Sequence, residues 1–195
     1  MDNSEEKLQL VAFSTNDSRH TPNDIIGIFL TQHEHNIIQK SNKVLAFSIM
    51  LPISKEIKKI MICSILNITV EYSGINEVNC YLLFIDLENE NSKMKFDSIM
   101  NYFKDFCELS KKVYVLGMVS GYAEEVKYIE KEYIIKKLDK IKIHYEYQEI
   151  NLNNIKEISD SIMNILVYCS EYTTLYNDNM NWDKGRAQSN SCEIV

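Results

Sequence analysis

The stretch "NCYLLFIDL", residues 79 to 87, decides the fold class of this chain. After Asn79 every residue up to Ile85 is apolar, which is typical of a strand that is covered on both faces in a parallel sheet. Ser92 follows shortly afterwards, and we expect it to cap a helix. Apolar residues then recur at spacings of three and four, as on the buried side of a helix: Phe96, Ile99, Met100, Phe103, Phe106 and Cys107. The stretch therefore predicts a strand–helix unit of an α/β protein.

The same alternation continues to residue 170. A strand over 112–116 is rich in β-branched and aromatic residues, and "IKIHYEY" (141–147) alternates as a second strand. We expect Asn153 or Asn154 to cap a last helix. Between the two strands, a helix from about Ala123 has one apolar side, made of Val126, Ile129, Tyr133, Ile134 and Leu138. Repeated strand–helix units predict parallel strands with right-handed crossovers.

The first half of the sequence predicts a further strand, a helix and a hairpin. Residues 7–14 form the strand, and Thr21 caps the helix, with Pro22 in its first turn. The apolar segments 43–54, interrupted at Pro52, and 58–70 predict two antiparallel strands joined by a charged turn near Lys55 and Glu56.

Composition predicts one ordered domain. The 195 residues are 45% hydrophobic and include only 5 Gly and 2 Pro, so we place a domain at 1–176 and a flexible tail at 177–195, where periodicity is lost. A net charge of -7 disfavours direct binding to nucleic acid. The acidic start lacks a basic leader and no apolar run reaches the length of a membrane span, which together predict a soluble intracellular protein.

The cysteines are widely separated, and none forms a C-x-x-C pair. This pattern predicts reduced thiols, of which the first four lie in apolar surroundings typical of a core. The five are Cys63, Cys80, Cys107, Cys169 and Cys192.

Ligand sites of such sheets lie at the carboxyl ends of the strands. After the first strand, "STNDSRHTPND" (14–24) has no glycine or lysine and two carboxylates, so it does not suit phosphate. Neither G-K-[ST] nor G-x-G-x-x-G occurs in the chain. Gly117 and Gly121 stand alone, and we expect 117–121 to form a connection to the next helix or part of a protein-binding rim.

Other candidate residues have structural interpretations beside the chemical ones. His33 and His35 form an H-x-H that could ligate a metal, but no second ligand cluster is visible, which favours a polar patch at a helix end. Asp86 is placed like a phosphoacceptor but lacks the acidic pair and lysine of such a site, so a turn or capping role is favoured. No histidine has a clear sequence relation to Ser120, so a nucleophile role has no support. We expect His144 to be a surface residue or a hydrogen-bonded core residue. The sequence thus predicts no catalytic, cofactor or metal site.

Residues 79–172 resemble the second half of a Ras-like small GTPase. In that family an Asn-Lys-x-Asp turn that reads guanine follows the strand at 112–116, whereas here residues 117–120 are Gly, Met, Val and Ser. "EYSG" (71–74) is similar to the family's Asp-x-x-Gly loop, with Glu71 for the aspartate and five residues before the next strand. The resemblance implies a Ras-like fold, with helices on both faces of a mostly parallel sheet, that has lost its nucleotide motifs.

Among such pseudo-GTPases, four stretches resemble the centromere protein M family of the inner kinetochore. They are "LAFSIMLPIS" (45–54), "CYLLFIDLENE" (80–90), "KVYVLGMVSG" (112–121) and "ISDSIMNILVYCSEY" (158–172). The long segment 58–70 departs from that family. The resemblance implies a nuclear, non-enzymatic subunit without a cofactor, which stabilises a helical-repeat partner, centromere protein I, together with the H and K subunits.

The last four residues offer a different hypothesis. Cys192 begins a C-terminal segment with the length of a C-a-a-X prenylation signal, although Glu193 fits the first aliphatic position poorly and only Lys184 and Arg186 lie upstream. Prenylation would indicate a cytoplasmic, degenerate Rab-like adaptor in membrane traffic. An active nucleotide enzyme with an unusual phosphate loop is a third, disfavoured hypothesis.

A binding module needs aromatic anchors outside the core. The aromatic residues that fall outside the apolar stripes are candidates for such an interface: Tyr122, Tyr128, Tyr172, Tyr176 and Trp182.

Overall fold

The computed structural model describes residues 7–16, 20–52, 55–65, 78–107, 109–121 and 126–170. The strands are β1 (Lys7–Ser14), β2 (His35–Lys40), β3 (Val44–Met50), β4 (Ile57–Ile65), β5 (Cys80–Asp86), β6 (Lys112–Val119) and β7 (Tyr145–Asn151). The helices are α1 (Pro22–Leu30), α2 (Ser92–Phe106), α3 (Lys131–Lys140) and a last helix over 155–170. The segment 71–74, the end of the predicted strand 58–70 and the predicted boundary at residue 176 lie outside the described residues.

The strands form one sheet in the order β2-β3-β4-β1-β5-β6-β7. β1 pairs in parallel with both β4 and β5, and β6 and β7 continue the parallel pairing. β2, β3 and β4 pair antiparallel. The prediction of an α/β protein with a mostly parallel sheet is therefore confirmed.

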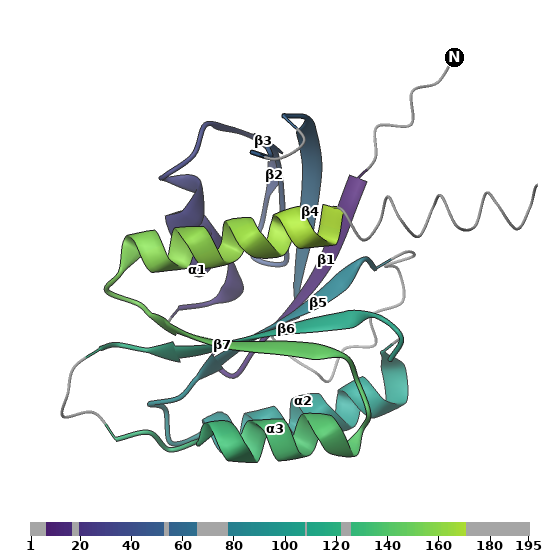
Figure 1. Cartoon of the computed structure of the whole chain (residues 1–195), viewed down its shortest axis with the longest axis vertical. Helices are drawn as coiled ribbons and strands as arrows, with labels where there is room; N and C mark the ends of the chain where they lie inside the picture. Colours follow the sequence, from purple (N-terminus) through teal and green to yellow (C-terminus); the bar gives the residue numbers. More distant parts are fainter. Residues whose placement is uncertain are drawn as a thin grey trace, which may run out of the picture.

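Helices cover both faces of the sheet (Figure 1). Successive residues of β1 point to opposite faces, so Leu10 and Ala12 pack with α1 and the last helix, while Val11 and Phe13 pack with α2 and α3. β5 alternates in the same way, with Phe84 on the first face and Leu83 on the second. The two cores thus explain why the interior strands are apolar without interruption.

Several predicted elements agree closely with the structure. β1 has the predicted bounds, and α1 begins with a capping box in which Thr21 and Asp24 exchange hydrogen bonds. β3 and β4 form the predicted hairpin, with Lys55 at a φ of 54° in its turn. Asn154 caps the last helix, because its Oδ1 accepts a hydrogen bond from the Glu157 N–H at 3.2 Å.

Strand β2 was not predicted from the sequence. All six of its side chains are exposed, so "HNIIQK" carries no alternation of buried and solvated positions. It exists because its backbone pairs with β3, as an edge strand can without a buried face of its own.

The predicted turn at Gly117 is wrong, because β6 continues to Val119. Gly117 pairs with Ile85 on one side and Glu149 on the other, so its backbone is held within the sheet. Of the two glycines Gly117 and Gly121, it is Gly121 that has a positive φ, of 78°.

The elements around β6 also begin later than predicted. α3 starts at Lys131 rather than near Ala123, and Val126 is exposed rather than on a buried helix side. The strand predicted at 141–147 is β7, which starts at Tyr145 because a turn with Lys142 at a φ of 56° follows α3. Ser92 does not cap α2: the N-cap is Asn91, without a side-chain hydrogen bond.

Gly121 and Gly27 provide a matched pair for testing backbone strain. A Cβ at Gly121 would meet Asn151 Nδ2 at 2.3 Å in a left-handed conformation, whereas a Cβ at Gly27 in α1 would have nothing within 4 Å. We expect Gly121→Ala to lower the free energy of unfolding by about 1–2 kcal/mol. Gly27→Ala should raise it by about 0.5–1 kcal/mol. Urea denaturation measures both, and equal effects of the two substitutions would contradict this account.

Candidate functional site

The carboxyl ends of β1, β5 and β6 meet at one edge of the sheet, because the three strands are parallel. We call the loops that follow them the rim. Described residues of these loops, together with Leu152 after β7, line a hollow of about 620 Å³. The described residues that line it are Asn16, His20, Asp86, Glu88, Asn89, Glu90, Ser120, Val126, Tyr128 and Leu152. This is the place where the sequence predicts a ligand site, if the chain has one.

Asp86 uses both carboxylate oxygens in bonds within the rim. The Asn16 amide donates to Oδ2 at 2.7 Å, and the Glu88 backbone N–H donates to Oδ1 at 3.1 Å. Asp86 therefore holds the turn after β5 and joins it to the end of β1, as the favoured structural interpretation of this residue requires.

A buried hydroxyl pair lies below Asp86. The Asp86 backbone N–H donates to Thr15 Oγ1 at 2.9 Å, and Thr15 Oγ1 lies 3.0 Å from Ser92 Oγ. Thr15 and Ser92 are both fully buried. Ser92 thus fastens the start of α2 to the end of β1 instead of capping the helix.

Glu88, in the loop after β5, is hydrogen-bonded to the residue that follows β6. Its Oε2 accepts a hydrogen bond from the Ser120 backbone N–H at 2.8 Å, and the Asn153 amide donates to the Ser120 carbonyl oxygen. The end of β6 is therefore held by contacts with the loops after β5 and β7.

The charge of the rim is unfavourable for phosphate. Asp86, Glu88 and Glu90 line the hollow, and no lysine or arginine is among its described lining residues. Three carboxylates would repel a nucleotide phosphate, which needs backbone N–H groups and cations.

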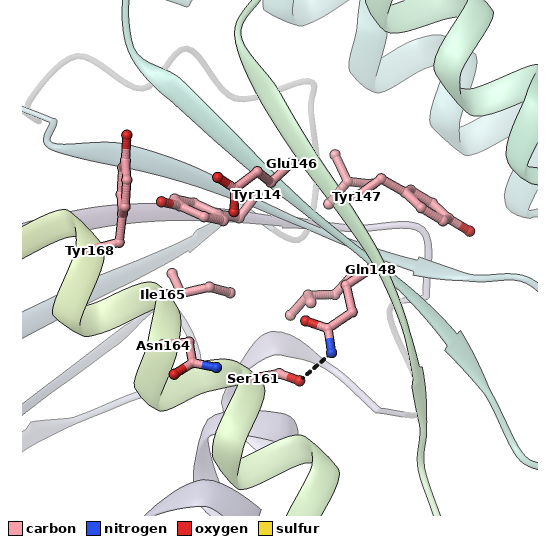
Figure 2. Close-up of a pocket in the computed structure, with 10 residues that line it drawn as sticks. Tyr114, Glu146, Tyr147, Gln148, Ser161, Asn164, Ile165 and Tyr168 are labelled. Atoms are coloured by element: carbon pink, nitrogen blue, oxygen red, sulfur yellow. Dashed lines mark hydrogen bonds between the residues drawn. The ribbon is translucent and has the colours of Figure 1, made fainter.

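A second hollow, which we call the tyrosine groove, lies between the last helix and strands β6 and β7 (Figure 2). Its volume is about 470 Å³. Gln148 from β7 donates a hydrogen bond to Ser161 Oγ of the helix at 2.9 Å. Tyr114 and Tyr168 meet edge to face, with ring centroids 5.8 Å apart.

The Tyr114 hydroxyl is buried and has no hydrogen-bond partner in the described part of the chain. Burial, together with nearby Cys169 and Glu146, raises the pKa of Tyr114, so its hydroxyl stays protonated. Beside the groove residues Tyr168 and Glu146, Lys112 Nζ lies 3.7 Å from the Tyr168 ring centroid and pairs with the Glu146 carboxylate. The ammonium is held by a carboxylate and by an aromatic face.

Of the predicted interface residues, the described part of the chain includes only Tyr128. It is 53% exposed on the wall of the rim beside Val126, and its backbone N–H donates to the Leu87 carbonyl at 2.8 Å. Tyr122, Tyr172, Tyr176 and Trp182 lie outside the described residues, as does Cys192 with its prenylation hypothesis.

The histidine pair has separate contacts. His33 Nε2 lies 2.8 Å from Ser159 Oγ of the last helix, and His35 Nδ1 lies 2.8 Å from the His33 carbonyl. Within the described ranges, no group of three or more His, Cys, Asp or Glu side chains is arranged to hold a metal ion. His144 is exposed.

Sequence reasoning missed two features. The tyrosine groove depends on how the last helix crosses β6 and β7, which no local pattern records. The second is an exposed apolar pair, Met50 and Ile57, which are paired residues of β3 and β4. Their position beside Pro52 at the hairpin end was the available signal, since a turn exposes the residues that flank it.

Comparison of the chain with protein-family models and with curated proteins gave no match. Among the helices that the structure describes, none has the length and apolarity needed to cross a membrane.

The buried hydroxyl pair should carry much of the rim's stability. Thr15→Val keeps the shape of the side chain but leaves the Asp86 N–H and the Ser92 hydroxyl without their partner, so we expect a loss of about 1–3 kcal/mol in the free energy of unfolding. The control Thr31→Val removes an exposed hydroxyl at the end of α1 and should change it by less than about 0.5 kcal/mol. Thermal or urea unfolding measures both, and a neutral Thr15→Val would show that these bonds are not needed.

Proposed function

We propose that this chain is a Ras-like pseudo-GTPase that acts as a non-enzymatic, protein-binding subunit. The single observation that carries the proposal is the acidic rim. Its carboxylates lie where a nucleotide phosphate would have to approach, and Asp86 and Glu88 are bonded within the rim.

The order of the elements supports the Ras-like assignment. β5, α2, β6, α3, β7 and the last helix follow one another with parallel pairing throughout, over the stretch that resembles the second half of a small GTPase. β1 lies inside the same sheet, and the loop after it lacks the glycines and lysine of a phosphate cradle.

The rim has features that suit a protein partner. Val126 is 66% and Tyr128 is 53% exposed, and both border the hollow. An exposed apolar pair beside a concave surface, surrounded by polar groups, is the composition of an interface centre with a polar periphery. We take the rim wall at Val126 and Tyr128 as the partner-binding surface.

The resemblance to the centromere protein M family gives this proposal its particular form. On that basis we propose a structural subunit of the inner kinetochore, located in the nucleus, that stabilises a helical-repeat subunit such as centromere protein I with the H and K subunits.

Affinity capture tests this function. The tagged full-length chain should recover inner-kinetochore subunits from mitotic cells of its own organism. The double variant Val126→Asp with Tyr128→Asp should reduce their recovery by at least about tenfold, because it places charge in the apolar centre of the interface.

The matched control is Met50→Asp with Ile57→Asp, which changes an exposed apolar pair elsewhere on the surface and should leave recovery unchanged. Loss only in this control would move the interface to the β3–β4 hairpin. Failure of the folded wild-type chain to recover any kinetochore subunit would contradict the kinetochore role.

A further inference from the structure

Two cysteine thiols from distant parts of the chain meet under the last helix. Cys80 is the first residue of β5 and Cys169 lies near the end of the described part of the helix, and their Sγ atoms are 2.8 Å apart. Both are buried, with 2% and 3% of their surfaces exposed. Since an S–S bond is about 2.0 Å long, the sulfurs need to move less than about 1 Å to bond.

The other described cysteines lie elsewhere in the fold. Cys63 is buried in β4 and Cys107 is partly buried at the end of α2. Burial raises the pKa of Cys107 to about 12, and a hydrogen bond with Tyr81 acts in the opposite direction. These two thiols serve as internal controls, because they lie in other parts of the fold and differ in burial.

The surroundings control access to the pair. Tyr114, with its unpartnered hydroxyl, lies beside Cys80 and Cys169 and also lines the tyrosine groove. Burial raises the pKa of the Cys80 thiol, and Lys112 opposes this only weakly. The Cys80 thiol thus stays protonated in this structure, and its reaction depends on local opening of the last helix near Tyr168.

We propose that Cys80 and Cys169 form a reversible disulfide that fastens the last helix to β5 when a hydroperoxide is the oxidant. In the first step one thiol loses its proton and its sulfur attacks a peroxide oxygen. The O–O bond breaks, and a sulfenic acid and one water form when hydrogen peroxide is the reagent. In the second step the other thiol's sulfur attacks the sulfenic sulfur, and the oxygen leaves as a second water. Two thiols and one peroxide give one disulfide and two waters, and a dithiol reductant reverses the modification.

The disulfide would close a long loop, because the two residues are 89 positions apart. Closing such a loop restricts the unfolded chain and should raise the midpoint of thermal unfolding by about 5–10 °C in oxidised protein.

The test uses the full-length chain treated with hydrogen peroxide. Free thiols are then alkylated in denaturant, and the protein is digested without reductant for peptide mass spectrometry. We expect one cross-linked pair of peptides, containing Cys80 and Cys169, with Cys63 and Cys107 recovered as alkylated thiols. Mild urea should accelerate the reaction, and dithiothreitol should restore all thiols and the lower unfolding midpoint.

Recovery of Cys80 and Cys169 as free thiols, or cross-linking of either one to another cysteine, would overturn the proposal. Cys80→Ser and Cys169→Ser should each abolish the midpoint shift, whereas Cys63→Ser should keep it. If a serine variant does not fold, peptide mapping of the wild-type chain still decides the question.

Discussion

The parallel pairing of β1 with both β4 and β5 is the interaction on which the rest of the structure depends. It places β1 inside the sheet, so its alternating side chains must be buried on both faces. Helices are then needed to cover each face of the sheet. α1, with Phe29, packs into the core on one face, and α2, with Phe103, packs into the core on the other. Because β1, β5 and β6 run in the same direction, their loops must meet at one edge. The position of the rim is therefore a consequence of strand direction.

What the rim does follows from how its polar groups are satisfied. Asp86 and Glu88 accept hydrogen bonds from Asn16 and from backbone N–H groups, and Thr15 and Ser92 share a buried contact. Buried polar groups that already have partners gain little from a ligand and resist being exposed. The rim is thus a set of bonds that ties three strand ends together, with Val126 and Tyr128 exposed on its wall.

The sequence predicted elements whose signals are local. The apolar stretch before Asp86 indicated an interior strand, and Thr21 with Pro22 indicated the start of α1. Tertiary contacts decided the cases that were predicted wrongly. Pairing with Ile85 holds Gly117 in β6, and the bond from Tyr128 to Leu87 holds residues 126–130 outside a helix.

The details of the site were less predictable than the fold. The sequence indicated the absence of a phosphate motif, since this depends on residues next to one another. It did not indicate that Asn16 meets Asp86 or that Cys80 meets Cys169, which lie 70 and 89 positions apart. Such contacts arise only once the strands are in register and the last helix has crossed them.

Nucleotide titration tests the central claim most directly. The purified chain is titrated with GTP and with GDP in the presence of Mg²⁺ and followed by calorimetry, with an active small GTPase as the positive control. The account predicts no saturable heat and no shift in the unfolding midpoint, because the rim presents carboxylates to the phosphates. Saturable binding with a stabilising midpoint shift would contradict it.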